Sequence, residues 1–364
     1  MRIGLTSPHA HPYVRRGAER FLHDLAWWLR TRDHEVTIVT TAPDATREIV
    51  DDDGVRIRYR HRGRPVGRGR LRLDELLRGV IPVARGLRRS DFDVVQAHHW
   101  YDGSAVRIAA KAPYVQWVPG VAHRGRFGGR PLHRLAFRTA VGGARHVVSL
   151  SEHAARTLRD ELGIESKVVP PGVRTHLFSG PRDPTEHPII LCTAAADDAR
   201  KQVDLLVRAF TTVHRDCPDA RLVLAPPDVS AAERLVVATD PSTRTAIDIR
   251  PIDDDATLAE LYRSASVTVL PSLDEAFGLV LVESLAAGTP VVGTDHGAIP
   301  EVVSADGIGQ LFAPNDADDL ARAIVASLEL HDDPGTVERC RKEAQRWDWS
   351  RVGPEFEALY DGLV

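Results

Sequence analysis

The chain has 364 residues, which is too many for a single ordinary hydrophobic core, so we expect two domains. An apolar content of 43% and a charged content of 27% are typical of a soluble globular protein, and the net charge of -4 excludes a general attraction to nucleic acid. No apolar run approaches the roughly 20 residues that cross a bilayer, and no secretory signal follows Met1. We therefore expect a cytoplasmic protein, with its three widely spaced cysteines as reduced thiols.

Short apolar strands alternate with amphipathic helices in the first half of the chain. A strand is predicted at Ile3–Thr6, and the helix expected next, Ala18–Arg30, carries apolar residues on one face. Further strands are predicted at Val36–Thr40, Asp93–Ala97, Tyr114–Val118 and His146–Leu150. This alternation is typical of parallel βαβ units in a doubly wound sheet.

The alternation breaks at Pro170-Pro-Gly172 and then resumes. Strands are predicted at Pro188–Thr193, Leu222–Ala225, Ala246–Arg250, Val267–Leu270 and Val291–Gly293. The simplest organisation is an α/β fold with two Rossmann-like doubly wound domains, residues 1–169 and 170–346, and an amphipathic helix over residues 347–364. Ligands of such sheets bind beyond the carboxyl ends of the strands.

Two glutamates with seven residues between them form the most informative pattern. Glu275 follows the predicted strand Val267–Leu270, and Glu283 lies inside the predicted helix Leu279–Ala287. A carboxylate on an otherwise apolar helix is costly unless it accepts hydrogen bonds, so Glu283 is expected to face a polar ligand. The amino end of the same helix is suited to binding phosphate. Two solvated glutamates on an ordinary βα unit are the alternative.

The text around this pair is specific. Pro271-Ser272, Glu275-Ala-Phe-Gly, Ala286-Ala-Gly-Thr-Pro-Val-Val and Gly297-Ala-Ile-Pro-Glu301 resemble the Glu-x7-Glu signature of retaining, family-4 (GT4) glycosyltransferases with the GT-B fold. The resemblance implies two Rossmann-like domains facing across a cleft, with the acceptor bound by the first domain and the nucleotide sugar by the second. It also implies a C-terminal helix that crosses back to the first domain, and catalysis without a bound metal or other cofactor.

The resemblance assigns the diphosphate to Lys201, between a predicted strand and helix. The family's arginine five residues earlier corresponds to Ala196 here, and Arg200 is expected to take part of its role. A further departure is Pro226-Pro227, where the family commonly has Gly-x-Gly, because prolines remove backbone donors. A plain surface lysine at a helix start is the alternative for Lys201.

The same resemblance assigns the sugar hydroxyls to Glu275 and the ribose hydroxyls to Glu283. Backbone N–H groups near the sugar are expected from Phe277, Gly278 and Leu279. The base is expected beside the segment Ile249–Ile252, which includes Arg250 and Ile252.

Two first-domain elements match the family. Arg16-Gly17-Ala18-Glu19-Arg20 corresponds to its Gly-Gly-x-Glu-Arg loop, so Arg16 and Gly17 are expected beside the acceptor or the phosphates. His98, at the end of a predicted strand, corresponds to the Ala-His element that lines the sugar site and is expected to bond a sugar hydroxyl or position the acceptor. A plain turn and a structural histidine are the alternatives. His98 and His99 are adjacent, and neighbouring side chains of a strand point to opposite faces, so no metal site is expected from this pair.

Two stretches are strongly basic: Arg56–Arg72, and the seven basic residues between His123 and Arg138. Either they form a solvated surface, or they form a cationic rim that attracts an anionic acceptor or anionic lipid headgroups. Because they lack an interleaved aromatic stacking platform and the net charge is negative, nucleic acid is not an expected partner.

The leading hypothesis is a retaining glycosyltransferase that moves a hexose-type sugar from a nucleoside-diphosphate sugar to a small-molecule acceptor, in natural-product or small-thiol biosynthesis. The alternatives are transfer to an anionic lipid at a membrane surface, and a catalytically degenerate nucleotide-sugar-binding protein. The sequence leaves open the donor base, the sugar, the acceptor and the oligomeric state.

Overall fold

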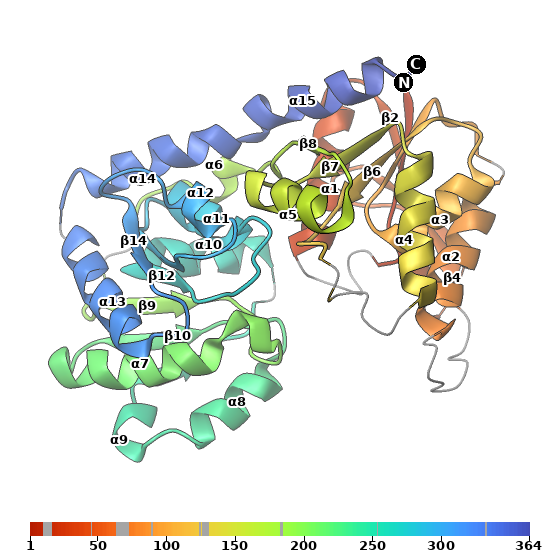
Figure 1. The fold of residues 1–364 in the computed structure, drawn as a ribbon. Coiled ribbons are helices and arrows are strands. Elements are labelled where there is room, and N and C mark those ends of the chain that lie inside the picture. The colour runs from red at the N-terminus through yellow and green to blue at the C-terminus, as the bar shows by residue number, and fades with distance from the viewer. Residues whose placement is uncertain are drawn as a thin grey trace. The chain divides into compact units, whose positions relative to one another are not determined.

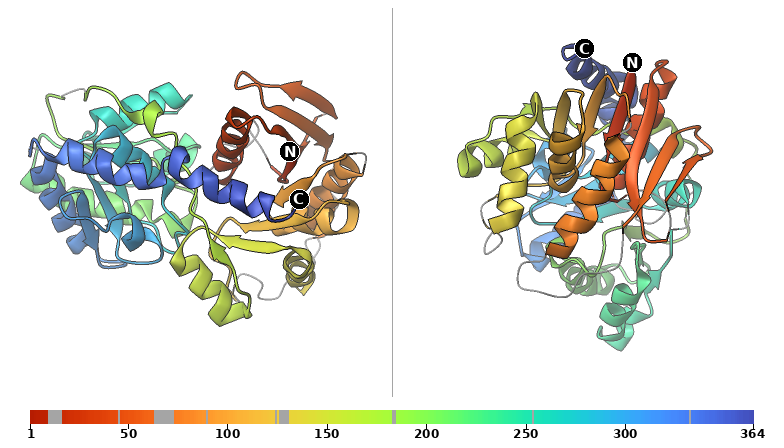
Figure 2. Two further views of the ribbon diagram at one scale, coloured as in Figure 1. Left: turned by 90° about the horizontal axis from the view of Figure 1, so that it is seen from above. Right: turned by 90° about the vertical axis from the view of Figure 1, so that its right-hand side faces the viewer.

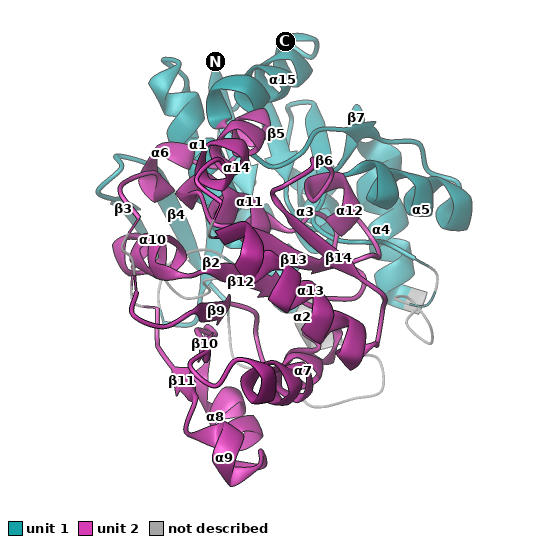
Figure 3. Ribbon diagram, turned by 90° about the vertical axis from the view of Figure 1, so that its left-hand side faces the viewer, with its two compact units in different colours: residues 1–172, 349–364 teal, residues 173–348 magenta. Residues whose placement is uncertain are grey.

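The computed structural model describes residues 1–364 except 10–16, 45, 63–72, 89, 124, 126–130, 183–184, 253 and 332. The chain divides into two compact units, shown in Figure 3: Met1–Gly172 with Trp349–Val364, and Val173–Asp348. The sequence placed these divisions two or three residues earlier, at 169/170 and 346/347. Each unit contains its own sheet and its own core.

Unit 1 is built on an eight-stranded sheet in the order β3-β4-β2-β1-β5-β6-β7-β8. Figure 1 labels β2, β4, β6, β7 and β8 of this sheet. All neighbouring strands are parallel except β3, which is antiparallel to β4 at the edge. The strands are β1 Arg2–Thr6, β2 Glu35–Ala42, β3 Arg47–Val50, β4 Arg56–His61, β5 Val94–Ala97, β6 Tyr114–Val118, β7 His146–Ser149 and β8 Lys167–Val168. The chain winds from β1 to β2 on one side and resumes with β5 on the other, so the topological switch point lies between β1 and β5.

The described residues of unit 1 also form the helices α1 Gly17–Thr31, α2 Leu73–Leu87, α3 Trp100–Ala109, α4 Pro131–Gly143, α5 Glu152–Leu162 and α15 Trp349–Asp361. Helices α2, α3 and α4 pack beside one another (Figure 2). The C-terminal helix α15 packs on α1, with the rings of Trp349 and Phe21 stacked at 5.7 Å. The approach is close because Gly353 faces Trp28, where a Cβ would lie 2.2 Å from the indole.

Unit 2 is built on a six-stranded, fully parallel sheet in the order β11-β10-β9-β12-β13-β14. Its strands are β9 Ile189–Cys192, β10 Arg221–Leu224, β11 Ile247–Ile249, β12 Val267–Leu270, β13 Val291–Thr294 and β14 Gly309–Phe312. Its helices are α6 Thr175–Phe178, α7 Val203–Asp216, α8 Val229–Val237, α9 Pro241–Arg244, α10 Asp255–Ser264, α11 Leu279–Ala287, α12 Ile299–Val302, α13 Ala317–His331 and α14 Thr336–Ala344, with 3-10 turns at Ala199–Lys201 and Gln345–Trp347. The switch point lies between β9 and β12.

Every strand predicted from the sequence is present to within two residues, and the predicted α/β class is confirmed. Strands β3, β4, β8 and β14 were not predicted. In β4, Arg56, Arg58 and Arg60 alternate with the buried Ile57 and Tyr59. This is the pattern of a half-buried strand, which the many arginines made hard to recognise in the sequence.

The first basic stretch is therefore partly structural. Arg58 donates to the Glu48 carboxylate at 3.0 Å and to the Ser90 hydroxyl at 2.7 Å, and Arg62 donates to the Thr41 hydroxyl at 2.8 Å. In the second stretch, His133 is buried and bonds the Tyr101 hydroxyl, so it belongs to no cationic rim. The remaining arginines from residue 63 to 72 lie outside the described residues.

Candidate active site

The candidate site of unit 2 lies where the strand order switches. Lys201 ends the 3-10 turn that follows β9, and Glu275 lies in the loop that follows β12. The two loops are joined by a backbone hydrogen bond in which Leu273 N–H donates to the Arg200 carbonyl at 2.7 Å. Adjacent strands thus bring together two residues that are 74 positions apart in the sequence.

Lys201 and Glu275 form an ion pair, with Nζ 2.5 Å from Oε2. The side chains are 24% and 18% exposed, so neither is fully buried. An ammonium group suits phosphate oxygens and a carboxylate suits sugar hydroxyls, so the pair offers both kinds of recognition at one point.

The backbone next to both residues is strained. Four described non-glycine residues have positive φ, and two of them, Gln202 at 46° and Asp274 at 51°, directly adjoin Lys201 and Glu275. A third, Asn315, accepts a hydrogen bond from the Gln202 side chain at 2.6 Å. Such conformations cost about 1–3 kcal/mol each and cluster at functional sites. The clustering here points to a function for this edge of the sheet.

Gly297 holds the backbone of Glu275 from the loop after β13. Its φ is 68°, and a Cβ at this position would lie 3.0 Å from the Glu275 carbonyl oxygen. The next residue, Ala298, donates its N–H to that same carbonyl at 3.1 Å. Glu275 is therefore positioned by three successive strands of the sheet.

The amino end of α11 lies directly after Glu275. Its N-cap is Gly278, with φ 103° and no side-chain hydrogen bond to the helix, and its first turn contains no acidic residue. The first-turn N–H groups and the positive end of the helix dipole are suited to an anion. The Phe277 ring is buried and packs edge-on against Trp347 at 5.9 Å, so its backbone is the part of Phe277 left for a ligand. The ligand contacts of Phe277, Gly278 and Leu279 stay predictions.

Glu283 is 4% exposed in the middle of α11 and accepts a hydrogen bond from the Tyr262 hydroxyl at 2.9 Å. The sequence predicted that this carboxylate needs hydrogen-bond donors, and Tyr262 of α10 supplies one. The assignment of Glu283 to the ribose stays a prediction.

Arg200 points toward Asp198, with Nη2 and Oδ2 2.6 Å apart, and its side chain is 54% exposed. Hydrogen bonds from this guanidinium also hold the pKa of Asp198 below its usual range despite burial. Arg250 and Ile252 follow β11, the outermost strand, two positions from β9 in the sheet. Their contact with a base stays a prediction.

In unit 1, Gly17 is the first residue of α1, and Arg16 lies outside the described residues. His98 follows β5 at the switch point and is buried. His99 begins α3, where its ring accepts the Tyr101 N–H at 3.4 Å as the N-cap.

Sequence reasoning missed several residues that shape these sites: Tyr262, Gln202, Asn315, Gln96, Asp102 and Tyr360. Gly297 stood in the quoted family motif, four positions after the predicted strand Val291–Gly293, but its part in positioning the Glu275 backbone was not predicted. The others contribute through tertiary contacts that leave no local pattern.

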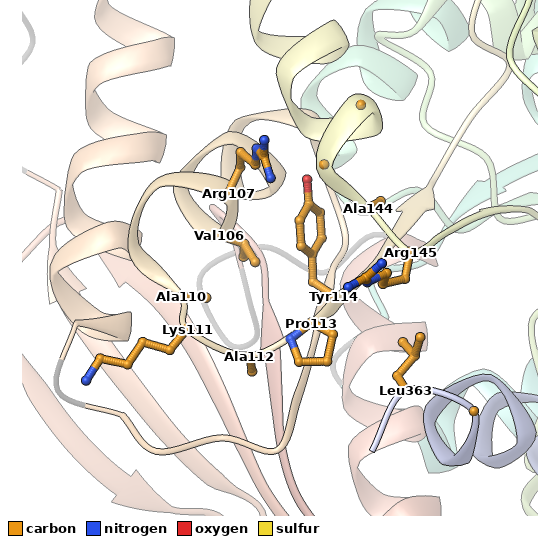
Figure 4. A pocket seen from close by; sticks show the side chains of 13 residues that line it. Val106, Arg107, Ala110, Lys111, Ala112, Pro113, Tyr114, Ala144, Arg145 and Leu363 are labelled. Atoms are coloured by element: carbon orange, nitrogen blue, oxygen red, sulfur yellow. The ribbon is translucent and has the colours of Figure 1, made fainter.

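A pocket of about 840 Å³ lies in unit 1, at the amino ends of strands β6 and β7 (Figure 4). His98, in contrast, follows the carboxyl end of β5. The pocket is lined by residues at the start of β6, before β7 and at the ends of α3 and α4, including Arg107, Lys111 and Arg145. Positive side chains at helix carboxyl ends complement the helix dipole, and we assign this pocket no ligand.

Within the described ranges, no three or more His, Cys, Asp or Glu side chains are grouped as a metal site would require. Among the helices of those same ranges, none has the length and apolar character that crossing a membrane demands.

Two doubly wound parallel-sheet units with a charged site at a switch point define a GT-B glycosyltransferase. The chain matches the family models for glycosyl transferases group 1 over residues 178–347 and glycosyltransferase family 4 over residues 15–177. It is 30% identical to D-inositol 3-phosphate glycosyltransferase 1 of Catenulispora acidiphila, over 86% of this chain and 82% of that one. The chain therefore belongs to the family-4 glycosyltransferases, as the sequence motifs predicted.

Other similarities cover the whole length. The chain is 26% identical to a phosphatidyl-myo-inositol mannosyltransferase of Propionibacterium freudenreichii subsp. shermanii, over 99% of this chain and 94% of the relative. Sucrose-phosphate synthase from Thermosynechococcus elongatus has the same fold, with a TM-score of 0.83 at 21% identity, over 100% of this chain and 98% of that one.

Proposed function

We propose that this glycosyltransferase moves a hexose-type sugar from a nucleoside-diphosphate sugar to a small-molecule acceptor with retention of anomeric configuration. The observation that carries the proposal is the Lys201–Glu275 ion pair beside the amino end of α11. Lys201 and the free N–H groups of α11 bind the diphosphate, Glu275 binds the sugar hydroxyls, and Glu283 binds the ribose. His98 in unit 1 bonds an oxygen of the sugar or of the acceptor.

In the proposed reaction, the bond between the anomeric carbon and the β-phosphate oxygen breaks while the acceptor oxygen bonds to that carbon on the same face. The acceptor proton passes to the departing phosphate oxygen. Negative charge therefore grows on the diphosphate in the transition state, where a preorganised ammonium and aligned N–H groups stabilise it. We propose that these groups take the place of a metal ion, so that no cofactor is needed.

For the acceptor, the names of the relatives suggest the first compounds to test. They are said to act on D-inositol 3-phosphate and on phosphatidyl-myo-inositol, which share a phosphorylated cyclitol. We propose a polyol phosphate, free or lipid-linked, as the acceptor. The natural-product or small-thiol context stays a prediction from the sequence.

A second candidate, transfer at a membrane surface, rests on α2. Leu77 and Ile81 lie one turn apart and are 38% and 40% exposed, and the exposed Arg85 continues the same row. An apolar row that ends in a cation suits an anionic lipid surface. Binding to phosphatidylglycerol vesicles at low salt that Leu77→Ser/Ile81→Ser abolishes supports this candidate, and no binding by the parent protein rules it out.

Calorimetric titration with UDP, GDP, ADP and dTDP tests the donor site. We expect one of the four to bind in the micromolar range and to lose most of its affinity in Lys201→Ala. Binding of none would overturn the proposal. Release of that nucleotide from its sugar conjugate, on addition of D-inositol 3-phosphate or a cell extract, separates an active enzyme from a degenerate binding protein.

A further inference from the structure

His98 is enclosed by aromatic rings in unit 1. It is 3% exposed, and its imidazole lies 4.9 Å from the Trp117 ring and 5.6 Å from the Phe21 ring, centre to centre. This burial lowers the pKa of His98 to about 3, so the ring is neutral near pH 7. A neutral imidazole has one N–H donor and one acceptor nitrogen, and its chemistry depends on which nitrogen carries the proton.

A chain of side-chain hydrogen bonds reaches one of these nitrogens from the C-terminal helix. The Tyr360 hydroxyl of α15 lies 2.6 Å from Gln96 Oε1, and Gln96 Nε2 lies 2.9 Å from His98 Nε2. All three side chains are buried, and 264 positions separate Tyr360 from Gln96 in the sequence.

The proton of Tyr360 decides the direction of this chain. Burial raises the pKa of the Tyr360 hydroxyl far above its ordinary value, so the hydroxyl keeps its proton and must donate it. Gln96 Oε1 is the acceptor that the described part of the chain provides. If the amide were turned over, its NH2 group would face the hydroxyl oxygen and leave the buried tyrosine proton without that acceptor, which is costly.

With the amide fixed in this way, Gln96 Nε2 donates to His98 Nε2. His98 Nε2 is therefore the acceptor nitrogen, and the proton must lie on Nδ1. Nδ1 is buried and has no hydrogen-bond partner among the residues described by the structure.

We propose that Tyr360, acting through Gln96, fixes His98 as a neutral imidazole that presents its Nδ1–H to an oxygen of the bound ligand. On this view His98 is a hydrogen-bond donor and does not act as a general base. Gln96 and Tyr360 are positioning residues, and the C-terminal helix is a functional part of unit 1. The ligand contact rests on the proposed function, whereas the tautomer does not.

The tautomer can be measured directly on the full chain labelled with 15N-histidine. Long-range 1H–15N spectra distinguish a protonated from an unprotonated ring nitrogen, and comparison with His98→Gln assigns the signals among the 16 histidines. We expect one neutral form with the proton on Nδ1. A proton on Nε2, or a charged ring at pH 7, would overturn the proposal.

Tyr360→Phe tests the origin of the tautomer. Without the tyrosine proton the Gln96 amide is free to turn, so we expect signals of both tautomers and a several-fold fall in kcat. Tyr114→Phe is the matched control: it also removes a buried tyrosine hydrogen bond in unit 1, to the Ala140 carbonyl, but lies away from His98. An unchanged His98 spectrum in Tyr360→Phe would also overturn the proposal. Because the spectra need no substrate, they decide it even if no transfer is ever found.

Discussion

The two sheets place their candidate groups at equivalent positions, but the groups differ in charge, exposure and hydrogen bonding. At the switch point of unit 2, Lys201 and Glu275 are charged, partly exposed and flanked by strained backbone. At the switch point of unit 1, His98 is neutral, buried and held by a chain of hydrogen bonds. Charged groups of the first kind stabilise charge that develops during a reaction, whereas a fixed neutral donor of the second kind orients a ligand.

Stability alone does not explain either arrangement. A partly exposed ion pair contributes only about 0.2–1 kcal/mol, which is no more than the cost of a single positive-φ residue beside it. A buried imidazole whose N–H finds no partner among the described residues, as in His98, likewise costs free energy. Both sites therefore carry a local cost that an apolar filling would avoid, which is expected where a ligand supplies the missing interactions.

Breaking the charged site has the largest expected effect. On the proposed function, Lys201→Ala and Glu275→Gln should each lower kcat/KM for sugar transfer by about 100-fold to 1000-fold, because each removes a proposed interaction with the reacting diphosphate or sugar. The rate is measured as nucleotide release with the donor that calorimetry identifies.

Arg208→Ala is the control for this pair of variants. Arg208 lies on α7, after Lys201, and its 66% exposed side chain pairs only with Asp204 one turn away at 3.6 Å among the described residues. Its removal should leave transfer unchanged. Wild-type rates in either Lys201→Ala or Glu275→Gln would show that the pair is structural.

The sequence predicted unit 2 better than unit 1 for a physical reason. Glu275, Glu283 and Gly278 lie on one βα unit, so their spacing alone places them at a strand end and along a helix. Lys201 was assigned through the family resemblance, and its place beside Glu275 depends on β9 and β12 being neighbours in the sheet, which no local pattern predicts.

The environment of His98 depends on contacts between distant segments. Tyr360 was predicted only as part of a packing helix, and no spacing relates it to Gln96. Asp102 lies in α3 and contacts Thr6 of β1, which is 96 positions earlier. Strand β4 was missed because its run of arginines suggested a solvated segment, although Ile57 and Tyr59 between them are buried.

A smaller effect is expected from the buried acid behind His98. Asp102 accepts hydrogen bonds from the Thr6 hydroxyl at 2.6 Å and from the backbone N–H of His98 at 2.8 Å. Burial is the main influence and raises the pKa of Asp102 from 3.8 to about 7. Between pH 4 and 7 the folded state therefore holds a proton that the unfolded state has lost. Folding stability attributable to this group falls as the pH rises through that window, by at most about 1.4 kcal/mol per pH unit.

Asp102→Asn removes this titration. The free energy of unfolding in urea, wild type minus variant, should decrease from pH 4 to pH 7 and be flat above pH 7. The comparison must be made as a difference because His98 acts in the opposite sense: its lowered pKa makes the folded state less stable as the pH falls below about 6.5. A difference that is constant from pH 4 to pH 8 would show that Asp102 does not titrate with a raised pKa.

The smallest effect tests whether the backbone of Glu275 needs its precise position. Gly297 and Gly307 have nearly the same φ, 68° and 73°, so an alanine at either should cost about 1 kcal/mol of stability.

The surroundings of these two glycines differ. A Cβ at Gly297 would press on the Glu275 backbone at 3.0 Å, whereas a Cβ at Gly307 meets the flexible side chain of Arg339. Gly297→Ala should therefore also lower kcat, by about tenfold, because displacing a catalytic group slightly is costly. Gly307→Ala should unfold as easily and react at the wild-type rate. If both variants kept wild-type kcat, the charged site of unit 2 would tolerate small movements of the Glu275 backbone. It would then differ even more from His98 of unit 1, which a chain of hydrogen bonds holds in place.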